Sequence, residues 1–385
     1  MNLAAVRRVP QGSADSLFKD PPLRPSAELD GLDLLLVTAL QTTPRADWQR
    51  LGQLLGTSAS TAARRWARLT QEGLAWQSCH PLDLPGMSPF AALFEIDTAA
   101  GQLFQVAAQL AEDPHVFDVI HLTGARDLLV LAGFSDHAQL ARYIGVRLAG
   151  LDGVIATRAQ VATAIHTEAS GWRADRLPTR PGAAARSPVP ALATGAAPRP
   201  PGGTEPDEAD LLLMAALSQD PRRPVAEMAD RTGLSPTTVT RRLARLQTGR
   251  VLAWRCDVAR VAAGWPVAAH LWGRVPPDQT AQVTTQLAGM REVRMCASIS
   301  GPSNLYLTVW LRTLRHLDVF EARLAACLPA LAITDRAMSL WHVKLGGHLV
   351  DPDGRRIRSI PLRLWPDQPA ARAQAVIVDR LRHGP

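Results

Sequence analysis

The chain has 385 residues, of which 46% are hydrophobic and 20% charged, so it is long enough for two to four globular domains. No apolar run approaches the ~18 residues that cross a bilayer, and the first residues lack the apolar core of a signal peptide, so we expect a cytoplasmic protein without a membrane partner. The net charge of +7 and pI near 10.0 favour a polyanionic partner. The spacing of the four cysteines and of the histidines predicts no metal site, disulfide or cofactor.

Residues 1–28 lack any periodicity and are expected to form a flexible tail, whereas residues 29–80 predict three short helices. The first helix ends before Pro44 and the second ends at Gly56. Ser58 is a plausible N-cap for the third helix. A helix, a glycine-containing turn and a capped helix bearing arginines are typical of a helix-turn-helix. The short strand 74–76 that follows predicts a wing.

Residues 88–166 alternate between strand and helix patterns. The expected elements are strands at 90–96, 116–123, 128–134 and 154–163, and helices at 98–111 and 138–148. This β-α-β-β-α-β order is the ferredoxin-like arrangement, in which both helices cover one face of a sheet. The fold class is therefore α+β, and the bare face of the sheet needs a second sheet to cover it.

The whole unit is then repeated at a fixed offset of 177 residues. Asp33 returns as Asp210, Arg64-Arg65 as Arg241-Arg242, and Gly124 as Gly301 (210 − 33 = 241 − 64 = 301 − 124 = 177). The predicted second copy comprises a winged helix-turn-helix at 207–258 and a ferredoxin-like domain at 264–345. Residues 167–206 are rich in proline, alanine and glycine and predict a linker. Residues 346–385 predict a C-terminal tail that wraps or leaves the second copy.

The chain resembles the Lrp/AsnC (feast/famine) transcriptional regulators, which join a winged helix-turn-helix to a ferredoxin-like ligand-sensing domain. The resemblance covers about residues 29–165 and 207–345, and its pieces occur in order and twice. They are the Leu29-Asp30-Gly31-Leu32-Asp33 opening, the turn residues Gly56/Ser58 and Gly233/Ser235, the Arg-Leu pairs that end the third helices, and the Gly-x-x-Asp-Leu loop at Gly124. The turn into the wing departs from the usual Gly-Val-Ile, since it is Gly73-Leu74-Ala75 and Arg250-Val251-Leu252 here.

Most members of that family carry one copy and dimerise, so the resemblance implies a covalent pseudo-dimer that binds double-stranded DNA, with further self-association of several chains conceivable. If the third helices enter the major groove, the side chains of their first turns face the bases. The candidate base-reading residues are Ser60, Thr61, Arg64, Thr237, Thr238 and Arg241. The candidate phosphate-binding residues are Arg65, Arg68, Arg242 and Arg245.

The two predicted readers differ in charge. Residues 58–73 carry three arginines and Glu72, a net +2, whereas residues 235–250 carry four arginines and no acid, a net +4. Because affinity rises with the number of phosphates neutralised, we expect the second reader to bind DNA more strongly, at an imperfectly palindromic operator.

For the sensor, the family resemblance implies an amino-acid effector whose carboxylate meets backbone N–H groups of the glycine loops. The candidate effector residues are Gly124, Arg126, Asp127, Gly301, Ser303 and Asn304. Asn304 stands where the first copy has Asp127, so the two sensor sites are expected to differ. An alternative in which these glycines only make tight turns remains open.

Two other functions stay open. Siroheme decarboxylases resemble the same two-domain architecture, but such an enzyme needs histidines and arginines converging on a tetrapyrrole, and the sensor segments show no concentrated pattern of these residues. We therefore expect no catalytic activity. The other alternative is an architectural DNA binder with a vestigial sensor. The histidines at 115, 121, 342 and 348 are expected at the surface or at an interface.

Overall fold

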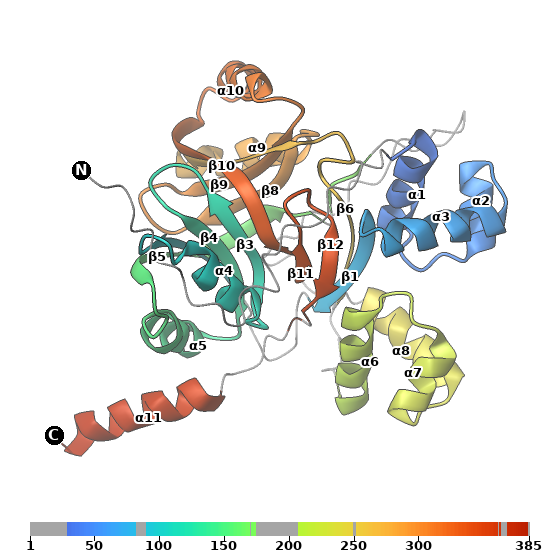
Figure 1. The fold of residues 1–385 in the computed structure, drawn as a ribbon, viewed down its shortest axis with the longest axis horizontal. Helices are drawn as coiled ribbons and strands as arrows, with labels where there is room; N and C mark the ends of the chain where they lie inside the picture. Colours follow the sequence, from blue (N-terminus) through green and yellow to red (C-terminus); the bar gives the residue numbers. More distant parts are fainter. Residues whose placement is uncertain are drawn as a thin grey trace, which may run out of the picture.

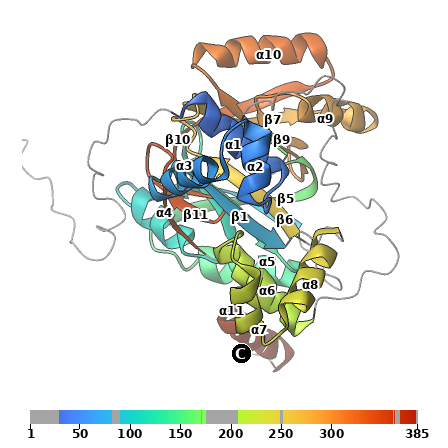
Figure 2. The ribbon, with the colours of Figure 1, turned by 90° about the vertical axis from the view of Figure 1, so that its right-hand side faces the viewer.

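The computed structural model describes residues 29–81, 90–169, 171–174, 207–248, 252–360, 362 and 368–383. Two three-helix units lie on one side of a large β-structure that carries further helices on its outside (Figures 1 and 2). The predicted tail 1–28 and most of the predicted linker lie outside the described residues. Among the helices of the described ranges, none is both long and apolar enough to cross a membrane.

The two three-helix units match the sequence prediction closely. Their helices are α1 Gly31–Thr42, α2 Trp48–Leu55, α3 Ala59–Gln71, α6 Glu208–Gln219, α7 Val225–Thr232 and α8 Pro236–Thr248. The Ser58 side chain accepts from the Thr61 amide at 3.1 Å, which confirms the predicted N-cap of α3. Gly56 and Gly233 adopt the left-handed conformation at the ends of α2 and α7, as expected for glycine C-caps.

The predicted wings are wrong. The strand after each three-helix unit, β1 (Ala75–Pro81) or β6 (Leu252–Val258), pairs antiparallel with its counterpart from the other copy, from Ala75 opposite Val258 to Pro81 opposite Leu252. Each strand also packs on the other copy's helices, because Cys79 joins the core of the second unit and Cys256 joins that of the first. A two-stranded ribbon therefore links the copies, and the partner of each strand lies too far along the chain for local sequence to indicate it.

The β-α-β-β-α-β order occurs twice. In the first copy it comprises β2 Phe90–Thr98, α4 Leu103–Ala111, β3 Val116–Leu122, β4 Leu128–Phe134, α5 His137–Arg142 with the π-helix η2 Tyr143–Leu148, and β5 Val154–Thr167. In the second it comprises β7 Val267–Arg274, the 3-10 turn η3 Pro277–Gln279, α9 Thr280–Ala288, β8 Val293–Ile299, β9 Leu305–Leu311, α10 Arg315–Cys327 and β10 Ala332–Leu345. The helix expected from residue 98 begins at Leu103 instead, because turns containing Gly101 at φ 80° follow β2.

The strands β5 and β10, each 14 residues long, join the two copies. The first part of β5 pairs with β2 and its last part pairs with β8 of the second copy. Reciprocally, the first part of β10 pairs with β7 and its last part pairs with β3 of the first copy. The eight strands thus form a closed ring, and each sheet covers the bare face of the other, as the sequence predicted.

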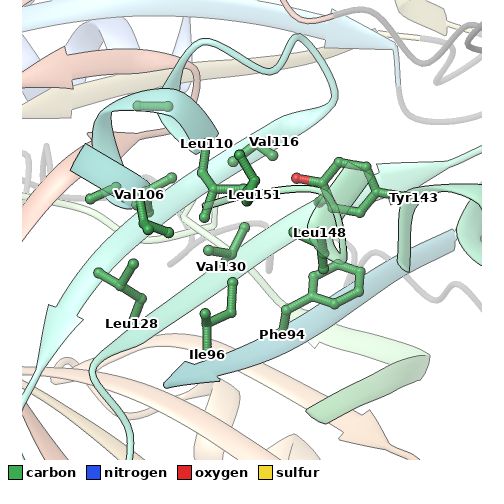
Figure 3. Packing of buried hydrophobic residues seen from close by; sticks show 14 of the residues in the cluster. Phe94, Ile96, Val106, Leu110, Val116, Leu128, Val130, Tyr143, Leu148 and Leu151 are labelled. Carbon is green, nitrogen blue, oxygen red and sulfur yellow. The ribbon is translucent and has the colours of Figure 1, made fainter. Parts of the chain in front are cut away.

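The ring encloses one core and carries two more under its helices. The enclosed core includes Leu93, Ile120, Leu129, Trp272 and Tyr306, all at most 2% exposed. The outer core of the first copy lies between the strands and α4, α5 and η2, as Figure 3 shows for Ile96, Val106, Leu110, Val130 and Tyr143. Burying these side chains against the sheet stabilises each half.

The predicted C-terminal tail and the beginning of the predicted linker are both packed against the rest of the protein. Residues after 346 form β11 (His348–Val350), β12 (Arg356–Ser359) and α11 (Gln368–His383). β11 pairs with β10 and with β12, and Leu349 is buried in the outer core of the first copy, not the second. The beginning of the predicted linker is also packed, since Trp172 is 5% exposed and its indole N–H donates to the Arg291 carbonyl at 3.0 Å.

The C-terminal segment also contacts the first three-helix unit at Gly73, just beyond the end of α3. The Arg356 amide donates to the Gly73 carbonyl at 2.9 Å. Gly73 has φ 67°, and a Cβ added there would lie 2.5 Å from the Arg356 carbonyl oxygen. The position therefore requires glycine for two reasons, its backbone conformation and the approach of β12.

We expect Gly73→Ala to lower the free energy of unfolding by about 3 kcal/mol, because it combines left-handed strain with overpacking against backbone. Gly56→Ala is the matched control, since Gly56 has φ 65° but no atom within 4 Å of an added Cβ; its cost should be about 1 kcal/mol. Urea denaturation of the full chain measures both. Equal costs would show that the contact with β12 is immaterial.

Candidate DNA-binding and effector-binding sites

The first turns of α3 and α8 have the same geometry in both copies. Thr61 and Thr238 are tied to the caps, because their hydroxyls lie 2.8 Å from Ser58 Oγ and 2.9 Å from Ser235 Oγ. Ser60 and Thr237 are exposed, although Ser60 Oγ lies 3.0 Å from Ser58 Oγ. Both helices thus present a short exposed hydroxyl side chain beside a cap.

The predicted arginines divide into two groups. Arg64 and Arg241 are exposed. Arg65 instead donates to Asp30 at 2.6 Å and to Asp33 at 2.8 Å, and Arg68 forms an ion pair with Asp33 as well as with Glu72. In the second copy, Arg242 pairs with Asp207 and Asp210, and Arg245 pairs with Asp210.

These ion pairs hold the third helix of each unit against the first. Asp33 is 1% exposed and Asp210 0%, and a buried carboxylate is costly unless charged partners compensate it. Both aspartates also close the capping boxes of α1 and α6. Each of the four predicted phosphate-binding residues, Arg65, Arg68, Arg242 and Arg245, therefore has an intramolecular ionic partner, with which a phosphate would compete. The sequence held the signal, since the separations of 32 and 35 residues recur in both copies.

These ion pairs leave the charge difference between the two readers unchanged. The equivalent arginines are paired in both copies, so the predicted advantage of the second reader depends on Glu72 in the first and Arg250 in the second. Glu72 lies 3.2 Å from Arg68, and Arg250 lies outside the described residues.

The two glycine loops lie where the copies meet. Gly124 (φ 95°) and Gly301 (φ 118°) both adopt conformations that favour glycine. An added Cβ on Gly124 would lie 3.8 Å from the Arg336 carbonyl on β10, and one on Gly301 would lie 3.6 Å from Gln160 on β5. Each loop therefore faces the long strand that crosses from the other copy.

The other predicted effector residues are engaged within the protein. Asp127 accepts from the Thr98 amide at 2.7 Å and hydroxyl at 2.8 Å. Asn304 accepts from the Val275 amide at 2.9 Å and donates to its carbonyl at 2.7 Å. Both side chains tie their loop to the end of the first strand of the same copy, so the Asp-to-Asn difference is no evidence that the two sensors differ. Ser303 Oγ lies 2.7 Å from Thr334 Oγ1.

Arg126 lies at the seam between the copies. It is 7% exposed, and its Nε lies 3.2 Å from Glu95 of the first copy. It also forms an ion pair with Asp335 of the second copy, and its guanidinium lies 4.1 Å from the centre of the Trp272 ring. A carboxylate effector that used Arg126 would have to compete with these two acids.

A buried ion pair joins the ribbon to the sensor half. Arg294 of β8 donates to Asp257 of β6 at 2.8 Å and lies 4.0 Å from the centre of the Trp310 ring. Burial alone raises the pKa of Asp257, but Arg255 and Arg294 together hold it below its ordinary value. The carboxylate therefore stays charged, and the ribbon under the three-helix units is fastened to the sheet.

Two family models match the chain, and the residues they match lie in the two three-helix units and in the first β-α-β-β-α-β half. The AsnC-type helix-turn-helix domain matches residues 29–70 and 207–247, and the Lrp/AsnC ligand binding domain matches residues 91–170. The HTH-type transcriptional regulator y4tD of Sinorhizobium fredii is 30% identical over 123 residues, which cover 30% of this chain and 72% of that protein. The chain belongs to the Lrp/AsnC family.

Other relatives of this Lrp/AsnC protein carry similar names. LrpA of Mycobacterium tuberculosis is 29% identical over 114 residues, 29% of this chain and 76% of that protein. The regulator PH0140 of Pyrococcus horikoshii is 27% identical over 144 residues, 36% of this chain and 88% of that protein. Relatives that span about one copy of this chain are thus described as transcriptional regulators.

The crystal structure of the siroheme decarboxylase NirDL is similar in fold over 92% of this chain and 100% of its own, with a TM-score of 0.53 and 15% identity.

Contrary to the sequence expectation, histidines and an arginine do gather inside this Lrp/AsnC protein. His270 and His342 are buried with ring centres 6.1 Å apart, and His342 and Arg260 line a cavity of about 10 Å³, room for about one water. His115 and His348 are buried too, so the surface is not their place, and His342 lies at the interface between the copies, opposite Ile120.

We expect Arg242→Ala to lower the free energy of unfolding by about 1–3 kcal/mol, because Asp210 stays buried with one ionic partner fewer. Arg241→Ala is the matched control, since its exposed side chain should change stability by less than about 0.5 kcal/mol. Urea denaturation of the full chain distinguishes the two, and Arg65→Ala with Arg64→Ala repeats the comparison in the first copy. Equal stability of the members of each pair would contradict the bracing role of the ion pairs.

Proposed function

We propose that this protein is a sequence-specific DNA-binding transcriptional regulator that acts as a covalent pseudo-dimer, and that a small effector such as an amino acid modulates its DNA binding. The observation that carries the proposal is the pair of capped helices, α3 and α8, on one side of the molecule, with Arg64 and Arg241 exposed at the same position of each. An exposed arginine on the first turns of a third helix suits bidentate contact with guanine.

The arrangement of the copies supports the pseudo-dimer. We propose that each half is a ferredoxin-like domain and that the closed ring takes the place of a dimer of separate chains. The β1/β6 ribbon and the exchange of β5 and β10 between the copies are the contacts that would otherwise lie between subunits. Two readers presented by one chain fit an operator with two half-sites.

The position of the glycine loops supports effector control. Both loops face strands that cross between the copies, so a ligand bound there would favour one packing of the ring over another. The Arg294–Asp257 pair would carry such a change into the ribbon that bears the readers. We expect the effector to bind where Gly124 or Gly301 exposes backbone N–H groups.

We expect Arg64→Ala and Arg241→Ala each to weaken specific DNA binding by about 1–3 kcal/mol without loss of stability. Fluorescence anisotropy with an operator selected in vitro measures this. The control is Arg50→Ala, an exposed arginine on α2, which should lower affinity for all sequences alike. The greater effect is expected from Arg241, and a greater loss from Arg64 would contradict the predicted dominance of the second reader.

We expect at least one amino acid to raise the melting temperature of the full chain by about 3–6 °C at 100 times its dissociation constant, and to change affinity for the operator. Thermal-shift measurements with single amino acids, followed by titration of the operator with the active one, test both. If amino acids bind but leave DNA affinity unchanged, the protein is instead an architectural binder.

The decarboxylase alternative is supported by the fold similarity and by the buried His270, His342 and Arg260. The cavity of about 10 Å³ beside His342 does not support it, because sites for ligands of that class occupy about 300–1,000 Å³. Absorbance titration of the purified chain with siroheme, with formation of a decarboxylated product, would overturn the regulator proposal in favour of the enzyme.

A further inference from the structure

The two three-helix units touch directly through their loops between the first and second helices. These loops contain Pro44-Arg45-Ala46 and Pro221-Arg222-Arg223, which are equivalent because 221 − 44, 222 − 45 and 223 − 46 all equal 177. Each loop follows the first helix of its unit directly, since α1 ends at Thr42 and α6 at Gln219. A contact between these loops therefore acts on the units that carry α3 and α8.

The contact is reciprocal. Arg45 donates through Nη1 to the Pro221 carbonyl and through Nη2 to the Arg223 carbonyl, the latter at 3.0 Å. Arg222 donates through Nη1 to the Pro44 carbonyl at 2.9 Å and through Nη2 to the Ala46 carbonyl at 2.8 Å. Each guanidinium thus spans two carbonyls of the other copy's loop, which a planar fork of donors does well and an ammonium group does not. We call this pair of arginines the loop clasp.

Aromatic rings support both arginines. The Arg222 guanidinium lies 4.3 Å from the centre of the Trp48 ring on α2, and that of Arg45 lies 5.9 Å from the centre of the Trp254 ring on β6. Both arginines are half-buried, and burial lowers the pKa of each; the proximity of Arg45 adds to the effect on Arg222. Four carbonyl acceptors and two ring faces therefore offset the mutual repulsion of two like charges.

The clasp adds a constraint that the ribbon alone lacks. The ribbon packs on both units, with Cys79 in the core of the second and Cys256 in the core of the first, but a single two-stranded ribbon twists readily. The loop clasp is a second connection, away from the ribbon, and therefore limits the rotation of one three-helix unit against the other. Gln77 links the ribbon to the loop clasp, because its side chain on β1 donates through Nε2 to the Pro44 carbonyl at 3.0 Å.

We propose that Arg45 and Arg222 are positioning residues that fix the distance between α3 and α8, and thereby the spacing of operator half-sites that the protein accepts. The inference rests on the proposed function, because it assigns the two helices to DNA. Rigid connection of two readers gives a high effective concentration at one spacing and a low one at others. Neither arginine needs to touch DNA for this effect.

The first experiment measures spacing preference. An operator selected with the wild-type full chain is rebuilt with its half-sites moved apart in single-base-pair steps over one turn, about 10 base pairs. We expect wild-type affinity to fall at least about tenfold within a few steps of the optimum, and the R45A/R222A variant to bind all spacings within about threefold. The R45K/R222K variant keeps the charge but loses the planar fork, so it should resemble R45A/R222A.

Two controls separate positioning from other effects. Arg50→Ala removes one exposed arginine of α2, so it should leave the spacing profile unchanged. Melting temperatures of all variants report stability. If R45A/R222A loses stability or affinity equally at every spacing and keeps the wild-type profile, the clasp is only a fold contact and the proposal is wrong. A wild-type profile in R45K/R222K would likewise overturn the assignment to fork geometry.

The second experiment needs no DNA. Spin labels on Gln53→Cys and Asp230→Cys, exposed positions at the same offset of 177, report the distance between the units in a Cys327→Ser background, which removes the one exposed cysteine among the described residues. We expect the distance between the two labels to have one narrow distribution when Arg45 and Arg222 are present and a broad distribution in R45A/R222A. Equal widths would overturn the clasp. A narrow distribution in a protein that binds no DNA would leave the clasp in place and remove the proposed function.

Discussion

The structure depends on two strands that each belong to both copies. β5 and β10 pair within their own half over one part of their length and with the other half over the rest. Because these pairings close the ring, the apolar faces of the two sheets meet and bury Trp272 and Tyr306 between them. Beside the ring, β1 pairs with β6 in a separate sheet, and both three-helix units lie on one side of the molecule. Backbone hydrogen bonds of the ring and of the ribbon thus join the two copies that carry the readers.

Several charged side chains among the described residues form ion pairs within the protein. Arginines on α3 and α8 brace buried aspartates, Arg294 fastens Asp257, and Arg126 sits between Glu95 and Asp335. Desolvated carboxylates require such partners, so a count of basic residues on a helix overestimates the charge offered to DNA. Arg64 and Arg241, which are exposed, are a small part of the arginine content but lie where a base-reading residue is needed.

Local features were predictable from the sequence, and contacts between the copies were not. The cap at Ser58 and the strand at 128–134 were predicted correctly, because caps and apolar periodicity act within a few residues. The wings were wrong because an isolated strand does not specify its partner. The bracing role of Arg65 was missed since its partners lie 32 and 35 residues earlier, although the repeated spacing held that information. The burial of His342 and His348 depends on the packing of the ring and of the C-terminal segment, which no local pattern encodes.

The exchange of strands also has a consequence for synthesis. When the first copy leaves the ribosome, the edges of β3 and β5 and the apolar face of their sheet have no partner until β8 and β10 have been made. From the end of β5 at Thr167 to the start of β10 at Ala332, translation takes about 10–30 s. During that interval the nascent chain exposes an open sheet edge, which is a template for aggregation. Joining both halves in one chain guarantees equal amounts of each, but the first half cannot complete its sheet until the second has been made.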